Sequence, residues 1–133
     1  MAFNILVVDD SEIIRTVIRK AIAISGLAVN EFHEAANGRE ALEMLQEKWI
    51  DIVLTDINMP IMDGVEMIRR MAADRLLQKL PVVIVSTERS QTRIAELLAL
   101  GVRAYLKKPF RPEDFHAVIT ELLAGPREEV AHG

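Results

Sequence analysis

Short runs of consecutive apolar residues recur along the chain and predict strands that are covered on both faces. Three such runs are Ile5–Val8, Ile52–Leu54 and Val82–Val85. Strands of this kind are typical of parallel sheets that lie between two layers of helices. Two further runs, Leu27–His33 and Ala104–Leu106, contain or adjoin polar residues, so we expect them at the two edges of the sheet.

The segments between these runs carry the signals that start and end helices. The first segment extends from about Glu12 to Ser25, repeats isoleucine at helical spacing, and ends before Gly26. The second and third open with capping boxes, in which Asn or Asp precedes Glu by three positions: Asn37 with Glu40, and Asp63 with Glu66. The fourth is Ser90–Leu100, which ends at Gly101, and Pro112 opens the fifth. Five alternating strand–helix pairs with right-handed crossovers predict a doubly wound, three-layer α/β sandwich.

Composition narrows the class of protein. The chain has 133 residues, of which 50% are hydrophobic and 27% charged, which suits one folded domain. It contains no cysteine, so disulfides and thiolate metal sites are excluded. The formal net charge, 16 − 20 = −4, argues against bulk binding to nucleic acid or to anionic membranes. No apolar run is long enough to span a bilayer, and we expect a cytoplasmic protein without membrane insertion.

Polar residues follow the predicted strands at the ends where ligands bind in open α/β sheets. The pairs at the ends of the first, third and fourth strands and the triplet after the fifth are Asp9-Asp10, Thr55-Asp56, Ser86-Thr87 and Lys107-Lys108-Pro109. Because the carboxyl ends of parallel strands meet at one rim of a sheet, we expect three carboxylates, one or two hydroxyls and a lysine to converge there.

The three carboxylates predict a divalent cation. An acid after a strand is also a common turn former or helix cap, and Asp10 alone would fit that interpretation equally well. Asp9, Asp10 and Asp56 together fit it poorly, because neighbouring like charges destabilise one another. A few carboxylate oxygens with retained waters are typical of Mg²⁺ beside a phosphate, and Lys108 would then face a bound anion. The rim therefore predicts phosphoryl chemistry.

Other nucleotide and hydrolase sites are excluded by spacing. The six glycines stand at positions 26, 38, 64, 101, 125 and 133, so neither G-x-G-x-x-G nor G-x-x-x-x-G-K occurs. The three histidines, at positions 33, 116 and 132, show no metal-ligand spacing, and none lies near Ser86. We interpret them as ordinary surface or partly buried residues.

The residues at the rim resemble the CheY-like receiver domain of two-component response regulators. The matching motifs are Asp9-Asp10, the segment Asp56–Gly64, Ser86 and Lys108-Pro109-Phe110. The resemblance covers roughly residues 3–124 and implies a flavodoxin-like (βα)5 fold with a parallel sheet in the order 2-1-3-4-5. We accordingly divide the chain into a receiver domain, residues 1–124, and a short polar tail, residues 125–133, which we expect to be disordered.

The resemblance also assigns roles at the rim. Asp56 would be the phosphoacceptor, attacking the phosphohistidine of a sensor kinase. Mg²⁺, with Mn²⁺ as an alternative ion, would be held by Asp10, Asp56 and the backbone carbonyl of Asn58, with Asp9 acting through water. Lys108 would pair with the phosphoryl oxygens, and its bond to Pro109 is expected to be cis.

The family pattern further predicts switch and tuning residues. Ser86 would hydrogen-bond the phosphoryl group and move toward it, while Tyr105 would change rotamer. Asn58, Thr87 and Glu88 would tune access and hydrolysis. Thr87 departs from the family pattern, in which this position is usually Ala or Gly, and its branched side chain is expected to narrow the approach to Asp56.

A second interpretation is a Mg²⁺-dependent aspartyl-phosphate phosphatase of the haloacid dehalogenase type. Such enzymes carry an acid two residues after the nucleophilic Asp, where this chain has Asn58. An amide cannot exchange protons usefully, so we expect a persistent acyl phosphate and not an enzyme beyond its own phosphorylation and slow dephosphorylation. Within signalling, the alternatives are a stand-alone messenger of the chemotaxis type, a phosphorelay intermediate, or a receiver from a larger transcriptional regulator.

The partners expected are a sensor histidine kinase or phosphotransfer protein and a separate effector protein. The effector would bind the face formed by the fourth helix, the fifth strand and the fifth helix, whose basic and switch residues are Arg89, Arg93, Arg103, Tyr105, Lys107 and Arg111. A solvated charged surface with no partner is an equally simple interpretation of this face. We expect no direct nucleic-acid binding, and a monomer or a weak phosphorylation-dependent dimer.

Overall fold

The computed structural model describes the backbone of residues 2–132 and the side chains of residues 2–123. Within these residues five strands alternate with five helices. The strands are β1 (Phe3–Val8), β2 (Val29–Ala35), β3 (Ile52–Thr55), β4 (Val82–Ser86) and β5 (Ala104–Lys107). The helices are α1 (Glu12–Ile24), α2 (Gly38–Glu47), α3 (Gly64–Ala72), α4 (Gln91–Ala99) and α5 (Pro112–His132). None of the described helices is both long and apolar enough to cross a membrane.

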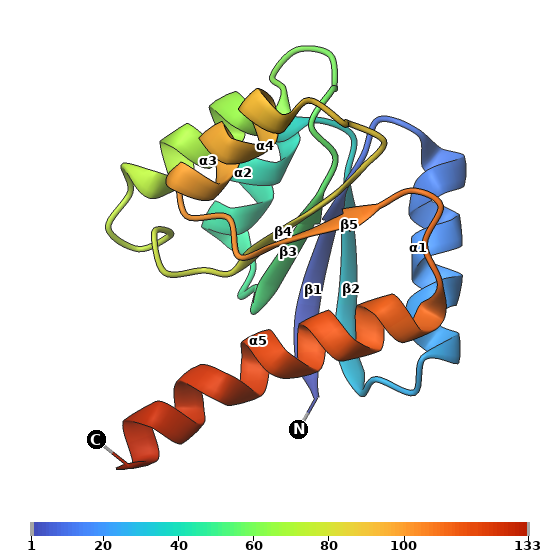
Figure 1. Ribbon diagram of the computed structural model, residues 1–133, viewed down its shortest axis with the longest axis vertical. Helices are drawn as coiled ribbons and strands as arrows, with labels where there is room; N and C mark the ends of the chain where they lie inside the picture. Colours follow the sequence, from blue (N-terminus) through green and yellow to red (C-terminus); the bar gives the residue numbers. More distant parts are fainter. Residues whose placement is uncertain (1, 133) are drawn as a thin grey trace.

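All strand pairs are parallel, and the sheet order is β2-β1-β3-β4-β5. Figure 1 shows α1 and α5 on one face of the sheet and α2, α3 and α4 on the other. The predicted doubly wound sandwich and its strand order are therefore confirmed, and β2 and β5 form the two edges as expected.

Two apolar clusters hold the layers together, because the residues of the central strands alternate between the faces. On one side Ile5 and Leu54 pack with Ile18 of α1 and Phe115 of α5, all buried. The other cluster joins the opposite faces of the same strands to α2, α3 and α4 through buried residues that include Leu6, Val53, Ala41, Met67 and Leu97. The sheet that carries the rim is thus fixed from both sides.

Side-chain caps fix where the helices begin. The Asn37 and Asp63 carboxamide and carboxylate oxygens accept hydrogen bonds from the backbone N–H groups three residues on, at 3.0 and 2.9 Å. Ser11 and Ser90 cap α1 and α4 in the same way. The capping residues predicted at positions 37 and 63 are confirmed, and both place the first turn of a helix beside the rim.

Two boundaries differ from the sequence-based expectation. Strand β2 is Val29–Ala35 instead of Leu27–His33, because its pairing with β1 skips Asn30 at an irregularity and continues until Ala35 faces Val8. Helix α5 extends to His132, past the predicted domain boundary at residue 125. The division into a domain and a disordered tail stays a prediction, since the side chains of residues 124–133 lie outside those described.

Candidate functional site

The sheet register brings Asp9 and Asp56 together. Val8 and Thr55 are partners in the ladder between β1 and β3, so the residues that follow them leave the sheet side by side. The Asp56 N–H donates to the Val8 carbonyl at 2.9 Å, and the Asp9 N–H donates to the Ala35 carbonyl at 3.1 Å. Backbone pairing with neighbouring strands therefore anchors both acids at the rim.

Three carboxylates converge at this rim, as predicted. One carboxylate oxygen from each of Asp9, Asp10 and Asp56 lies within 4.8 Å of the others. Asp9 is buried, Asp56 is partly buried and Asp10 is exposed, so the group opens to solvent on one side. Hard oxygen donors in this number, with an open side for water, fit the requirements of Mg²⁺.

Lys108 bridges two of these acids from the end of β5. Its Nζ lies 3.0 Å from Asp9 Oδ2 and 3.3 Å from Asp56 Oδ2. Burial alone would lower the pKa of the Lys108 ammonium, but the hydrogen bond to Asp9 and the negative charge of Asp56 outweigh it and raise the pKa. Lys108 is therefore a cation at neutral pH. The predicted cis bond between Lys108 and Pro109 is present.

The surroundings of Asp9 disfavour a negative charge on its carboxyl group. Burial raises the pKa of its carboxyl, and the hydrogen bonds from the Ser11 N–H and from Lys108 only partly oppose this effect. The Coulomb repulsion of Asp56 acts in the same direction as burial. An added cation would therefore relieve both the desolvation and the repulsion.

Asp56 is held by the loop between β3 and α3. Its Oδ1 accepts a hydrogen bond from the Ile57 N–H at 2.7 Å, which fixes the side chain beside Lys108. The same loop returns to the strand end at Gly64, whose N–H donates to the Ile57 carbonyl at 2.7 Å. A Cβ at Gly64 would lie 2.4 Å from the Asp56 carbonyl oxygen, so only glycine permits this approach.

Ser86 and Tyr105 are linked through the segment after β4. The buried Ser86 hydroxyl accepts a hydrogen bond from the Glu88 N–H at 3.1 Å. The Tyr105 hydroxyl donates to the Glu88 carbonyl and lies 3.4 Å from the Ser86 carbonyl oxygen. Burial raises the pKa of the Tyr105 hydroxyl, so it remains a donor at neutral pH. Both predicted switch residues thus form hydrogen bonds with the backbone of Glu88, in the loop after β4.

The three predicted tuning residues differ in exposure. Asn58 and Thr87 are exposed, and Glu88 is partly buried. The Glu88 Oε2 atom accepts a hydrogen bond from the Ser90 N–H at 3.1 Å, which turns the carboxylate toward the start of α4. The Glu88 carboxylate is therefore engaged in a local hydrogen bond, whereas the Thr87 side chain is exposed to solvent.

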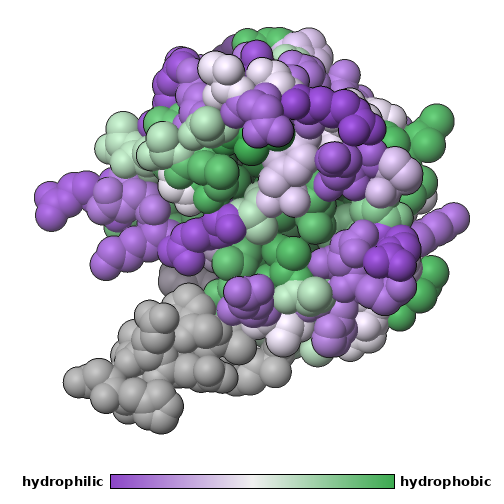
Figure 2. Space-filling model, viewed as in Figure 1, coloured by the Kyte–Doolittle hydropathy of each residue, from purple (hydrophilic) through white to green (hydrophobic). Residues whose placement is uncertain are grey.

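The predicted basic face carries less unpaired positive charge than its number of arginines suggests. Arg93 lies 3.7 Å from Glu88 Oε1 and 3.9 Å from Asp63 Oδ2, and Arg111 pairs with acids in the first turn of α5. Within the described side chains, the cations of this face that have no ion pair are Arg89, Arg103 and Lys107. Figure 2, which views this face, shows purple hydrophilic side chains around a smaller green area.

Sequence reasoning missed one contact at the rim. The Arg15 Nη1 atom of α1 donates to the Asp9 carbonyl at 2.6 Å, and its Nε donates to Glu34 Oε1 of β2 at 2.8 Å. Nothing local in the sequence marks these two contacts, because Arg15 lies on α1, Glu34 on β2 and Asp9 just after β1. Only the helical position of Arg15, one turn after the Ser11 cap, hints that it faces back toward the strand end.

Comparison with known proteins places these observations in a family. The sequence model of the response regulator receiver domain matches residues 5–120. Chemotaxis protein CheY-3 of Vibrio cholerae is 37% identical over 107 residues, which cover 80% of this chain and 81% of that protein. The two-component response regulator ORR11 of rice is 36% identical and covers 90% of this chain and 80% of its own length.

Solved structures give the same result. The chemotaxis response regulator CheY4 of Vibrio cholerae superposes with a TM-score of 0.80 at 32% identity. The superposition covers 92% of this chain and all of that one.

Proposed function

This chain belongs to the response regulator receiver domain family, and from that premise we propose that it is a phosphorylation switch with Asp56 as the acceptor. The observation that carries the proposal is the rim, where three carboxylate oxygens lie within 4.8 Å and Lys108 contacts two of the acids. A lone acid would serve as a turn former, whereas three converging carboxylates beside a lysine suit a bound cation and a phosphoryl group.

The acceptor step follows from the positions of the side chains. One Asp56 carboxylate oxygen attacks the phosphorus of a phosphohistidine on a sensor kinase or phosphotransfer protein. The new O–P bond forms as the P–N bond breaks, and the electron pair of that bond stays on the imidazole. Lys108 Nζ, now 3.3 Å from Asp56 Oδ2, is placed to follow the added charge onto the phosphoryl oxygens.

The metal ligands proposed are Asp10, Asp56 and the backbone carbonyl of Asn58, with Asp9 acting through water. Bound there, Mg²⁺ or Mn²⁺ would supply charge stabilisation to the transferring phosphoryl group. Asp9 supports the site from its buried side. Its carboxylate orients Lys108 and adds negative charge while it is shielded from solvent.

The product is a signal and not a turnover intermediate. Asn58 occupies the position two residues after Asp56, and its amide cannot act as a general acid or base. Thr87 and Glu88 are proposed to tune the access of water. The chain is therefore a signalling protein that is phosphorylated and slowly loses its phosphate, and phosphatase turnover on small esters is not expected.

Transmission starts at the loop after β4. The Ser86 hydroxyl accepts a hydrogen bond from the Glu88 N–H and keeps its own proton to donate, so a shift of Ser86 toward a phosphoryl oxygen would pull the loop with it. That movement displaces the Glu88 carbonyl, which is the acceptor for Tyr105, and frees the tyrosine to adopt a second rotamer. The change reaches the face of α4, β5 and α5.

The output is proposed to be a separate protein that binds this face. The similarity to chemotaxis proteins of the CheY type favours a chemotaxis or motility effector. The second candidate is a phosphorelay intermediate, and the rice response regulator among the relatives shows that similarity alone does not select the pathway.

The test is incubation with acetyl phosphate, with and without Mg²⁺, followed by intact-mass measurement. We expect the mass of one phosphoryl group to be gained only with the metal, and to be lost in Asp56→Asn. The control Asp51→Asn changes an acid at the opposite end of β3 and should label normally. Multiple-turnover phosphate release from small esters would instead establish the phosphatase.

A further inference from the structure

Asp9 is held at four atoms, and one of the four contacts comes from outside the described site. Its N–H pairs with Ala35, its Oδ1 accepts from the Ser11 N–H at 2.9 Å, and its Oδ2 accepts from Lys108. Its carbonyl lies beyond the last pair of the β1 ladder. That carbonyl accepts instead from Arg15 Nη1 at 2.6 Å.

The Arg15 guanidinium is itself fixed in place. Its side chain is 15% exposed, and its Nε donates to Glu34 Oε1 at 2.8 Å. Two donors of one planar group thus engage acceptors on two different strands, the Asp9 carbonyl beside β1 and the Glu34 carboxylate of β2. A planar, pre-organised fork transmits position between its partners better than a single flexible ammonium does.

We propose that Arg15 is a positioning residue for the phosphorylation site, acting through the peptide bond between Asp9 and Asp10. The Asp9 carbonyl belongs to that peptide, so holding its oxygen fixes the plane from which Asp10 continues. Asp10 is the exposed member of the three carboxylates and has the most freedom to turn away. This inference rests on the proposed function, in which Asp10 is a metal ligand.

Electrostatics alone makes the opposite prediction. Arg15 is a cation near an anionic site, so removing its charge would tighten the binding of another cation. Positioning predicts weaker binding, because Asp10 would need to be ordered when the ion arrives. The sign of the change in Mg²⁺ affinity therefore separates the two roles.

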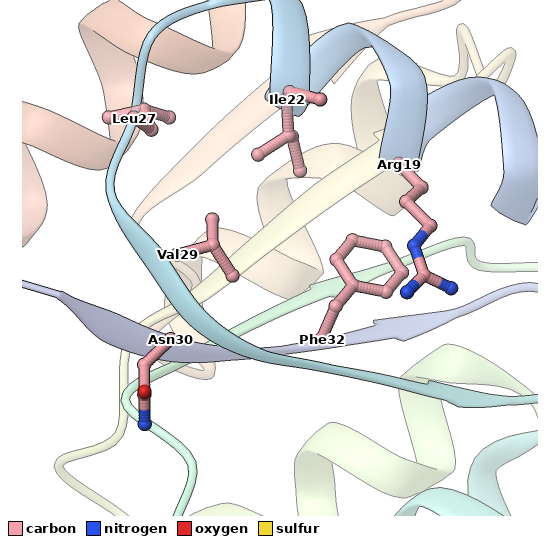
Figure 3. Close-up of a pocket in the computed structure, with 7 residues that line it drawn as sticks. Arg19, Ile22, Leu27, Val29, Asn30 and Phe32 are labelled. Carbon is pink, nitrogen blue, oxygen red and sulfur yellow. The ribbon is translucent and has the colours of Figure 1, made fainter.

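Arg19 is the matched control. It lies one turn further along α1, and its Nη1 is 3.5 Å from Glu34 Oε2, the other oxygen of the same carboxylate. Its guanidinium lies over the Phe32 ring, 4.9 Å from the centroid, beside the hollow lined by Ile22, Leu27 and Val29 (Figure 3). Arg19 therefore shares the charge and the carboxylate with Arg15 and lacks the contact to Asp9.

The experiment measures Mg²⁺ affinity by isothermal titration calorimetry in the wild type, Arg15→Gln and Arg19→Gln. We expect Arg15→Gln to bind Mg²⁺ about tenfold more weakly, as is usual when a group that orients a ligand is removed. Arg19→Gln should stay within about twofold of the wild type at physiological salt. Phosphorylation of Arg15→Gln by acetyl phosphate should slow at low Mg²⁺ and recover at saturating Mg²⁺.

A second readout needs no metal. Amide hydrogen exchange at Ser11, whose N–H donates to Asp9 Oδ1, should be faster in Arg15→Gln and unchanged in Arg19→Gln. If Arg15→Gln does not fold, Arg15→Lys replaces it, since one ammonium cannot reach both acceptors in the same geometry and should also weaken Mg²⁺ binding.

Wild-type or tighter Mg²⁺ affinity in folded Arg15→Gln or Arg15→Lys overturns the proposal. Unchanged Ser11 exchange in the folded Arg15 variant also overturns it. Failure of the proposed function looks different, because the wild type itself would then gain no phosphoryl group at Asp56.

Discussion

At the scale of single residues, Ile61 stands out in the loop between β3 and α3. Its φ is 68°, and among residues 2–132 it is the only non-glycine residue with a positive φ. The Met62 N–H donates to the Pro60 carbonyl at 2.7 Å, which closes a tight turn around it. A side chain branched at Cβ is poorly suited to this region of backbone conformation, and Ile61 is also exposed.

The strain predicts a stabilising substitution. Ile61→Gly should raise the free energy of unfolding by about 1 kcal/mol, because glycine has no Cβ to strain in a γ-turn with positive φ. Urea denaturation monitored by circular dichroism measures the change. Ile61→Val keeps the branch and should give no gain, so equal effects of the two substitutions would contradict the strain argument.

Thr87 carries the second prediction at this scale. It is exposed and follows Ser86 at the end of β4, where we expect it to narrow the approach to Asp56. Thr87→Ala should accelerate labelling by acetyl phosphate by a few-fold, since a smaller side chain widens the approach to the acceptor. Mass spectrometry over time gives the rates, with Thr92→Ala on α4 as the control. Equal rates in the wild type and Thr87→Ala would refute the steric role.

At the scale of elements, the features predictable from sequence are those set by local physics. Apolar runs fixed the central strands, and side-chain caps such as Asn37 and Asp63 fixed the starts of helices. Because parallel strands end at one rim, the convergence of Asp9, Asp56 and Lys108 also followed from sequence.

The features that could not be predicted depend on contacts between distant elements. The shift of β2 to Val29–Ala35 arises from its pairing with β1 and not from its own pattern. The ion pair between Arg93 and Asp63 joins residues thirty positions apart, and the Arg15 contact to Asp9 needs α1 to pack against the strand end. Spacing within one element carries no signal for any of these.

The junction of β3 with α3 provides the prediction at this scale. Gly64→Ala places a Cβ 2.4 Å from the Asp56 carbonyl oxygen, so α3 must move away from the end of the strand. We expect a loss of about 3 kcal/mol in the free energy of unfolding and slower phosphorylation of Asp56.

Gly101→Ala is the matched control for this junction. Gly101 has φ 104° but open space around its Cβ position, so only the backbone strain of about 1 kcal/mol applies. It should leave phosphorylation unchanged. Equal losses of stability in the two variants would show that close packing at Gly64 is not limiting.

At the scale of the whole molecule, the net charge of −4 is unevenly distributed. Three carboxylates gather at the rim, and burial raises the pKa of the Asp9 carboxyl there. A carboxyl whose pKa is raised by folding stabilises the fold below its unfolded value of 3.8, and that contribution is lost as pH rises through the raised value. The site therefore costs stability at neutral pH until a cation binds.

This cost predicts the behaviour of Asp9→Asn without metal. The variant should be more stable than the wild type at pH 7, and the difference should shrink as the pH falls toward 3.8 and Asp9 is protonated. Lys108 does not change protonation between pH 4 and pH 7. Its pKa is raised above 10.5, so its stabilising contribution is lost only at higher pH.

Saturating Mg²⁺ should reverse the order of stability, because the wild type gains binding free energy that the variant largely lacks. Thermal unfolding at pH 4 and pH 7, with Mg²⁺ or with EDTA, measures both effects. The account fails if Asp9→Asn is less stable than the wild type at pH 7 in EDTA. It also fails if Mg²⁺ raises the melting temperature of both proteins equally, since Asp9 would then contribute nothing to the cation site.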